Sequence, residues 1–142
     1  MNIEYNNNLS ADDYCMLRKS VGWSDISIII VEKAIEKSDY IITAELNSTK
    51  IGMGRVINDG TQAFILDVVV HPDYQGFGIG KSMMLKIMGY LKDNLQQGQN
   101  ILVNLSATKG REDFIQNLVL KSDQQKNLVK VWRNGYLRVA RT

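Results

Sequence analysis

Two amphipathic segments near the start of the chain predict two short helices. In each, apolar residues recur at the three- and four-residue spacing of a helix face. The first set is Tyr14, Leu17 and Val21, and the second is Ile28, Val31 and Ile35. The first helix is expected over residues 11–20, with Ser10 as its N-cap. The polar pair Ser24 and Asp25 is expected to cap the second helix.

Four segments rich in β-forming residues predict strands, one before these helices and three after them. They cover residues 3–5, 40–46, 50–58 and 63–70. Turn-forming pairs, Asn-Ser and Asp-Gly, separate the last three, which predicts an antiparallel meander. Gly52 and Gly54 weaken the middle strand of the three and indicate that another backbone or a ligand passes close to it.

A continuous apolar stripe predicts a long helix that begins near Gly80 and ends before Gly98. Its members are Met84, Ile87, Met88, Leu91 and Leu95. Because the stripe has the width of one helix face, we interpret its methionines as core. Residues 101–105 predict a further strand. We expect it to run parallel to residues 63–70, since a helix of this length usually joins parallel strands.

The C-terminal part of the chain also contains strand patterns. Residues 127–132 and 136–140 alternate between apolar and polar positions, and the pair Asn134-Gly135 between them favours a type I′ hairpin turn. Two final strands are therefore expected. Basic residues outnumber acidic ones in this part, which fits either a solvated edge or a frayed or intermolecularly packed tail.

Length and composition fit a single domain that is neither a membrane protein nor a nucleic-acid-binding one. The chain has 142 residues, is 44% hydrophobic and carries a net charge of +2. No apolar run of about 18 residues and no signal-peptide pattern is present, so we expect a cytoplasmic location. Because Cys15 is the single cysteine of the chain, an internal disulfide is excluded. His71 is the one histidine, so no metal is expected, and we interpret His71 as a surface or capping residue.

A glycine-rich loop joins residues 63–70 to the long helix. It reads Gln75-Gly76-Phe77-Gly78-Ile79-Gly80 and continues into Lys81-Ser82. Backbone N–H groups at such a loop and helix N-terminus favour an anion, usually a phosphate. The glycine spacing of the dinucleotide-binding fingerprint differs from that of this loop. The P-loop differs too, because its first glycine would fall on Gln75. We therefore consider a nucleotide-binding P-loop protein less favoured than the two hypotheses that follow from the resemblance described next.

The whole pattern, a hydrophobic strand followed by V-x-P-x-Y-Q-G-x-G-I-G-K, resembles motif A of the GCN5-related N-acetyltransferases, the GNAT superfamily. The resemblance implies one GNAT domain over residues 1–142. It also implies an α/β (α+β) fold, with a mixed central sheet of about six to seven strands flanked by about four helices. In that family a splayed strand pair holds acetyl-coenzyme A, which serves as co-substrate.

The resemblance also implies positions for the cofactor. The pyrophosphate would lie on the loop formed by Gln75, Gly76, Phe77, Gly78, Ile79 and Gly80, with Lys81 either beside it or solvated. The pantetheine arm would pair with the backbone of Val68, Val69 and Val70, and Phe114 would pack near it or in the core of the last helix.

Acetyl transfer needs aligned reactants, a deprotonated amine and a stabilised oxyanion. The carboxylate best placed as general base is Asp67, although it could instead be hydrogen-bonded in the strand or face away. A backbone N–H near Val68 or Val69 would meet the oxyanion. Trp23 is expected either to face the acceptor or to fill the gap between the first two helices, and the second alternative is favoured. The acceptor would be a primary amine of a small molecule or peptide. Since members of the family often form homodimers, a homodimer is also possible for this chain.

The resemblance ends after Phe114. The family usually has a tyrosine next, which protonates the leaving thiolate, whereas this chain has Ile115. Residues 115–142 diverge from the family. If the codons at the start of this divergence are assumed to be AT-rich, inserting one base shifts the reading frame and gives the family's usual ending. We therefore hypothesise that the tail is frameshifted. The leading hypothesis is an N-acetyltransferase with weakened activity. The alternative is a non-catalytic or degenerate module that binds coenzyme A.

Overall fold

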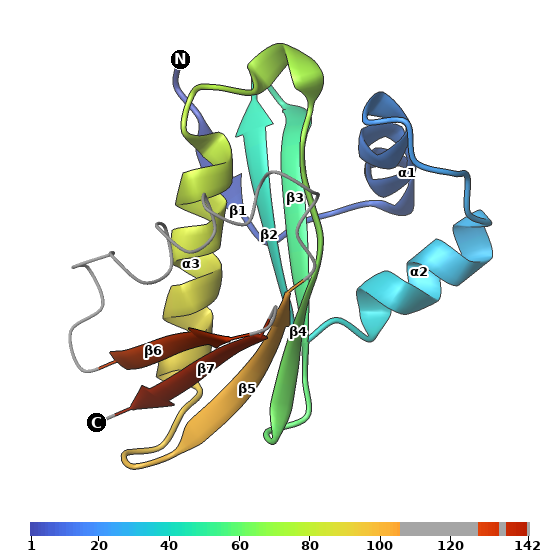
Figure 1. Ribbon diagram of the computed structural model, residues 1–142. Coiled ribbons are helices and arrows are strands. Elements are labelled where there is room, and N and C mark those ends of the chain that lie inside the picture. The colour runs from blue at the N-terminus through green and yellow to red at the C-terminus, as the bar shows by residue number, and fades with distance from the viewer. Residues whose placement is uncertain (106–127, 134–135, 142) are drawn as a thin grey trace.

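The structure is a computed structural model that describes residues 1–105, 128–133 and 136–141, the last two ranges by their backbone (Figure 1). Within these ranges the chain forms seven strands and three α-helices. In chain order they are β1 (Glu4–Asn6), α1 (Ala11–Ser20), α2 (Ile28–Glu36), β2 (Tyr40–Leu46), β3 (Thr49–Asn58), β4 (Gln62–Val70), α3 (Ile79–Asp93), β5 (Asn100–Leu105), β6 (Leu128–Arg133) and β7 (Tyr136–Arg141). A short 3₁₀ turn, Pro72–Tyr74, precedes α3.

The seven strands make one mixed sheet in the order β1-β2-β3-β4-β5-β7-β6. Every neighbouring pair is antiparallel except β4 and β5, which are parallel and joined through α3. The predicted meander, the parallel strand and the two C-terminal strands are confirmed, and so is the mixed α/β class. Phe114 and the last helix expected around it lie outside the described residues, as does the predicted turn at 134–135.

Helix α3 covers one face of the sheet, while α1 and α2 lie on the other (Figure 1). The predicted apolar stripe of α3 is buried against β2, β3 and β4, so its assignment to the core is confirmed. Met83 and Ile79 join it, with exposures of 0% and 2%. Each such side chain stabilises the fold by about 1.5–3 kcal/mol on burial.

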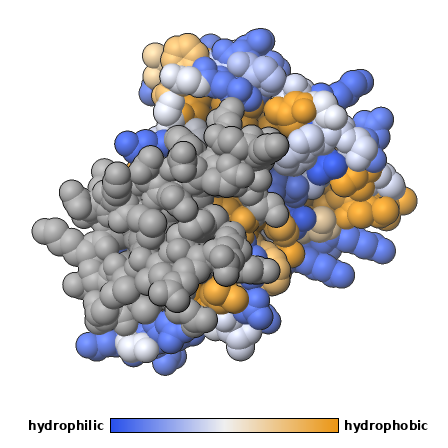
Figure 2. Space-filling view, in the orientation of Figure 1, coloured by the Kyte–Doolittle hydropathy of each residue, from blue (hydrophilic) through white to orange (hydrophobic). Residues whose placement is uncertain are grey.

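The opposite face of the sheet carries a smaller core under α1. Its buried members are Tyr14, Leu17, Val31, Met53 and Val69. Helix α1 has the predicted bounds, and Ser10 Oγ accepts a hydrogen bond from Asp13 N at 3.1 Å. The first residues of α2 cover this core only in part, because Ile28, Ile29 and Ile30 are 40–66% exposed. Figure 2 shows apolar surface at the right, where α2 lies in Figure 1.

The prediction that Ser24 and Asp25 cap α2 is wrong. The N-cap is Ser27, whose carbonyl accepts the first helical hydrogen bond from Val31 N at 3.0 Å. The reason is tertiary: the Arg18 guanidinium donates to Ser24 O at 3.1 and 3.4 Å, which holds this carbonyl in the connection between the helices.

The two glycines of β3 serve the packing of α3. A Cβ at Gly52 would lie 3.2 Å from the Met83 side chain, and one at Gly54 would lie 3.3 Å from the Ile87 side chain. The neighbours that pass close are therefore helix side chains, not the backbone or ligand that the sequence suggested. The glycines let α3 approach the sheet closely, and this places the N-terminus of α3 beside the end of β4.

Candidate active site

Strand β4 separates from β5 after its first half. The two strands pair only from Gln62 with Leu102 to Ile65 with Leu105. Beyond this point residues 66–70 keep their partner β3 on one side and have no strand of the described chain on the other. Val68, Val69 and Val70 lie on this segment, as the predicted splay requires. A strand edge with unpaired N–H and C=O groups can pair with an extended ligand.

A β-bulge interrupts β4 at the start of this segment. Met53 pairs with Val69 and Arg55 pairs with Leu66, so two residues of β4, Asp67 and Val68, stand opposite Gly54. Asp67 has φ of +55°, in the left-handed region. The extra residue changes which face each side chain of β4 occupies, an outcome that the sequence pattern did not predict.

The glycine loop turns the chain from the end of β4 into α3. Gly76 and Gly78 have φ of +87° and +79°, a conformation that residues with a Cβ rarely adopt. A Cβ at either position would meet nothing within 4 Å, so the backbone conformation, not crowding, requires glycine there. Gly78 is the N-cap of α3. Because glycine has no side chain, no side chain of the cap residue accepts a hydrogen bond from the first N–H groups of the helix.

The structure brings the other predicted loop residues to the same place. Gln75 Nε2 donates to Val70 O at 2.9 Å, which ties the loop to the end of β4. Phe77 is 63% exposed, and Lys81 is exposed on the first turn of α3. The Ile79 side chain is buried in the core, so only its backbone faces the loop. A Cβ at Gly80 would lie 3.7 Å from Val70 Cγ2, an ordinary contact.

Asp67 lies at the centre of a charged cluster that the sequence analysis did not foresee. Its Oδ2 accepts from Tyr14 Oη at 2.6 Å and from Arg55 Nε at 2.7 Å. Arg18 Nη1 lies 3.6 Å from its Oδ1. The three charged side chains are only 12–15% exposed. The available signal was the lone charged residue within residues 51–57 of β3, where every other residue is apolar or glycine, since Arg55 needs a buried partner there.

Tyr14 takes part in this cluster as a neutral donor. Burial of its ring raises the pKa of the phenol, and the hydrogen bond to Asp67 together with the negative charge of that carboxylate raises it further. The proton therefore stays on Tyr14 at neutral pH. The sequence identified Tyr14 only as an apolar helix position, and its hydroxyl gives it this second contact.

Trp23 lies in the connection between α1 and α2. The Arg18 guanidinium packs over its ring at 5.1 Å, and 40% of the residue remains exposed. The favoured interpretation, a side chain that only fills the gap between the helices, leaves this exposure unexplained. Its role toward an acceptor stays a prediction.

Four further expectations concern His71, the residues from Phe114 onward, metal binding and membrane spans. His71 Nδ1 accepts from Asp73 N at 3.1 Å and caps the 3₁₀ turn, so its predicted capping role is confirmed. Phe114 and Ile115 lie outside the described residues. Among the residues that the structure describes, no group of three or more His, Cys, Asp or Glu is placed to hold a metal ion. None of the described helices is both long and apolar enough to cross a membrane.

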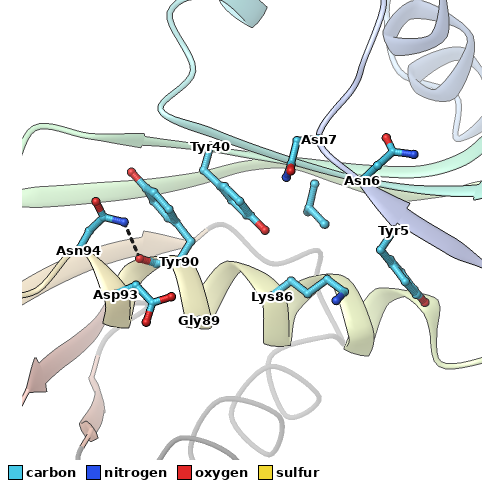
Figure 3. Close-up of a pocket in the computed structure, with 10 residues that line it drawn as sticks. Tyr5, Asn6, Asn7, Tyr40, Lys86, Gly89, Tyr90, Asp93 and Asn94 are labelled. Atoms are coloured by element: carbon cyan, nitrogen blue, oxygen red, sulfur yellow. Dashed lines mark hydrogen bonds between the residues drawn. The ribbon is translucent and has the colours of Figure 1, made fainter.

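A separate pocket of about 360 Å³ lies between β1, β2 and α3 (Figure 3). The rings of Tyr40 and Tyr90 stack at 4.6 Å along it, and Lys86 Nζ lies 5.3 Å from the centre of the Tyr5 ring. None of its lining residues belongs to the glycine loop or to residues 66–70. It is therefore distinct from the site at the end of β4.

The sequence matches a family model described as Acetyltransferase (GNAT) family over residues 8–111. Among curated proteins, it is 42% identical over 82 residues to an uncharacterized N-acetyltransferase ycf52-like protein of Prochlorococcus marinus, covering 54% of this chain and 46% of that one. It is 37% identical over 97 residues to an uncharacterized N-acetyltransferase ycf52 of Gracilaria tenuistipitata, covering 63% and 52%. The chain thus spans about half the length of the curated relatives it matches.

Solved structures resemble nearly the whole chain. A Staphylococcus aureus protein of unknown function, described as a "Probable Acetyltransferase", is 26% identical with a TM-score of 0.76, covering 93% of this chain and 99% of that one. The PaiA N-acetyltransferase of Thermoplasma acidophilum, solved in complex with coenzyme A, is 18% identical with a TM-score of 0.58 and full coverage of both chains. The latter likeness concerns the fold alone.

Proposed function

Because this chain belongs to the GNAT acetyltransferase family, we propose that it moves an acetyl group from acetyl-coenzyme A to a primary amine of a small molecule or peptide. The observation that supports this most directly is one continuous structure: a β4 edge over residues 66–70 that pairs with no other strand among the described residues, followed by two left-handed glycines that open onto the N-terminus of α3. An extended arm and a pyrophosphate need these two features side by side.

In the proposed complex each part of acetyl-coenzyme A has a place. The N–H groups at the start of α3 and the loop from Gln75 to Gly80 would hold the pyrophosphate, with Lys81 near it. The free edge of β4 at Val68, Val69 and Val70 would hold the pantetheine arm. Acetyl-coenzyme A supplies the thioester. Phe77 and Phe114 stay as predicted neighbours of the cofactor.

The reaction we propose is direct attack within a ternary complex. The neutral amine nitrogen forms a bond to the thioester carbonyl carbon, and the C–S bond breaks as the tetrahedral species collapses. The nitrogen loses one proton, and the departing thiolate takes one up. A backbone N–H near Val68 or Val69 would face the oxyanion, and the main contribution of the protein is to hold the reactants together.

The groups that move protons stay predictions. Asp67 is the predicted general base, and Ile115 occupies the position where the family has its acid, a side chain that cannot donate a proton. A Trp23 contact with the acceptor, a homodimer and a cytoplasmic location are likewise proposals.

The second candidate function is a module that binds coenzyme A without transfer. It is favoured by one observation: the family match ends at residue 111, before Phe114 and the divergent residues 115–142. Strands β6 and β7 lie beyond the match and still complete the sheet beside β5. The frameshift hypothesis for these residues remains a prediction, which sequencing the gene in close relatives would test.

An assay of thiol release separates the two functions. Purified protein is incubated with acetyl-coenzyme A and a panel of primary amines, including polyamines, amino sugars and short peptides, and free thiol is measured. We expect amine-dependent thiol release that falls below detection in Gly78→Glu. Binding of acetyl-coenzyme A without release for any amine would contradict transfer and favour the binding module.

A further inference from the structure

Asp67 has an unfavourable backbone conformation, whose energetic cost must be offset by contacts with its surroundings. Its φ of +55° lies in the left-handed region, which few residues with a Cβ adopt and in which Asp and Asn are enriched. Of the described non-glycine residues with positive φ, the other two, Asn47 and Ser48, form the tight turn between β2 and β3. Asp67 alone lies inside a strand.

The carboxylate of Asp67 is held from two sides of the fold. Tyr14 and Arg18 reach it from α1, and Arg55 reaches it from β3. The arginines are themselves fixed: the Arg18 guanidinium also donates to Ser24 O, and Arg55 Nη1 donates to Ser38 Oγ at 3.4 Å. A side chain gripped in this way cannot rotate freely, so its backbone is held too.

The bulge at Asp67 determines what β4 presents further along. Before it, Ala63 and Ile65 face the core under α3. After it, Val69 belongs to the core under α1, while Val68 and Val70 pack on the α3 side. Uninterrupted alternation would have placed Val69 with Ala63 and Ile65, because side chains of a strand alternate with a period of two. One inserted residue therefore sets the orientation of the whole free segment.

Resting on the proposed function, we propose that Asp67 is a positioning residue. Its carboxylate, held by Tyr14, Arg18 and Arg55, fixes the bulge of β4 and thereby aims the backbone of residues 68–70 at the pantetheine arm. The cluster also ties α1 to the strand proposed to bind the cofactor.

The contacts favour this role over that of a general base. A base must accept a proton from the acceptor amine at hydrogen-bond distance. In Asp67, Oδ2 already accepts two hydrogen bonds, at 2.6 and 2.7 Å, and Oδ1 faces the Arg18 guanidinium. Both oxygens are directed into the cluster, and the side chain is only 15% exposed.

Two substitutions at residue 67 separate the roles. Asp67→Asn keeps an oxygen that can accept from Tyr14 and Arg55, and asparagine tolerates positive φ. Asp67→Val removes the acceptor and resists the left-handed conformation, because it is β-branched. The dissociation constant for acetyl-coenzyme A is measured by calorimetry, together with the melting temperature. Val31→Ala, which opens a cavity in the same small core from α2, controls for general destabilisation.

We expect Asp67→Val to weaken acetyl-coenzyme A binding by about tenfold or more, since a small displacement of a positioning group is costly. Asp67→Asn is expected to remain within about threefold of the parent. Val31→Ala is expected to bind like the parent despite a lower melting temperature. Unchanged binding in Asp67→Val, with a parent that binds, would overturn the positioning role alone. A parent that does not bind would contradict the proposed function and this role with it.

Transfer to any amine found by the thiol assay provides the second readout. A positioning residue predicts that Asp67→Asn keeps most of the turnover with an unchanged pH profile. A general base predicts a loss of turnover of about a hundredfold or more, with acetyl-coenzyme A binding intact and the alkaline rise of the pH profile displaced. That second result would overturn the proposal.

Discussion

At the scale of single residues, the cluster around Asp67 places charged groups where they are largely removed from water, and the loss of their hydration is unfavourable. One carboxylate and two guanidinium groups lie at 12–15% exposure under α1. Removing one partner of such a pair leaves the other charge without its counterion in a poorly solvated place. The three side chains are therefore expected to depend on one another for stability.

Replacing Arg55 tests this dependence. We expect Arg55→Met to lower the free energy of unfolding by about 1–3 kcal/mol, less than a fully buried pair because water still reaches the cluster. Arg18→Met should cost less, since Arg18 lies 3.6 Å from the carboxylate and Arg55 Nε lies at 2.7 Å. Urea unfolding gives both values. A double-mutant cycle with Asp67→Asn, which removes the charge of residue 67 but keeps an acceptor oxygen, should show the charge coupling between residues 55 and 67, and additive effects would contradict this dependence.

At the scale of elements, the close approach of α3 to the sheet depends on the glycines of β3. Met83 fills the space over Gly52, and Ile87 fills the space over Gly54. This contact fixes how far α3, and with it the glycine loop at its N-terminus, lies from β4. The site is thus supported by packing on a strand that itself makes no contact predicted for the cofactor.

Filling that space should separate α3 from the sheet. We expect Gly52→Val to lower the free energy of unfolding by about 1–3 kcal/mol, because its Cβ would lie 3.2 Å from the Met83 side chain and 3.3 Å from Ala44 Cβ. Gly89→Ala is the matched control: Gly89 is helical, nothing lies within 4 Å of its Cβ position, and alanine should stabilise α3 by about 0.5–1 kcal/mol. Thermal unfolding measures both, and equal stability of Gly52→Val and the parent would refute the packing argument.

The elements themselves could largely be predicted from sequence, because periodicity reports which face of each segment is buried. The bounds of α1 and β2 and the parallel β5 follow from such patterns. What could not be predicted depends on contacts between distant segments. The bulge at Asp67 depends on how β3 and β4 pair, and the glycines of β3 are required by the packing of α3.

The same division holds for the candidate site. The glycine loop has a local signature, since left-handed positions need glycine and the spacing is visible in the sequence. Apart from the arginine in β3, the cluster of Tyr14, Arg18, Arg55 and Asp67 has no local signature, because its members come from three elements and meet only in the folded chain.

At the scale of the whole molecule, a continuous seven-stranded sheet supports one site at the place where two parallel strands part. The family match covers β2 to β5 and the glycine loop, and β7 pairs with β5 along residues 100–104 from beyond that match. The half of the sheet that carries the site therefore belongs to the family by sequence as well as by fold. We propose that this place binds acetyl-coenzyme A.

Calorimetric titration of the protein with acetyl-coenzyme A tests that claim most directly. The variants are Gly78→Glu, in the loop, and Gly60→Glu, in the β3–β4 turn at the other end of β4. Both positions have positive φ, +79° and +91°, and open space around the Cβ position, so the backbone strain and added charge are alike. We predict saturable binding by the parent and by Gly60→Glu, and none by Gly78→Glu. Equal binding by both variants, or none by the parent, would contradict the claim.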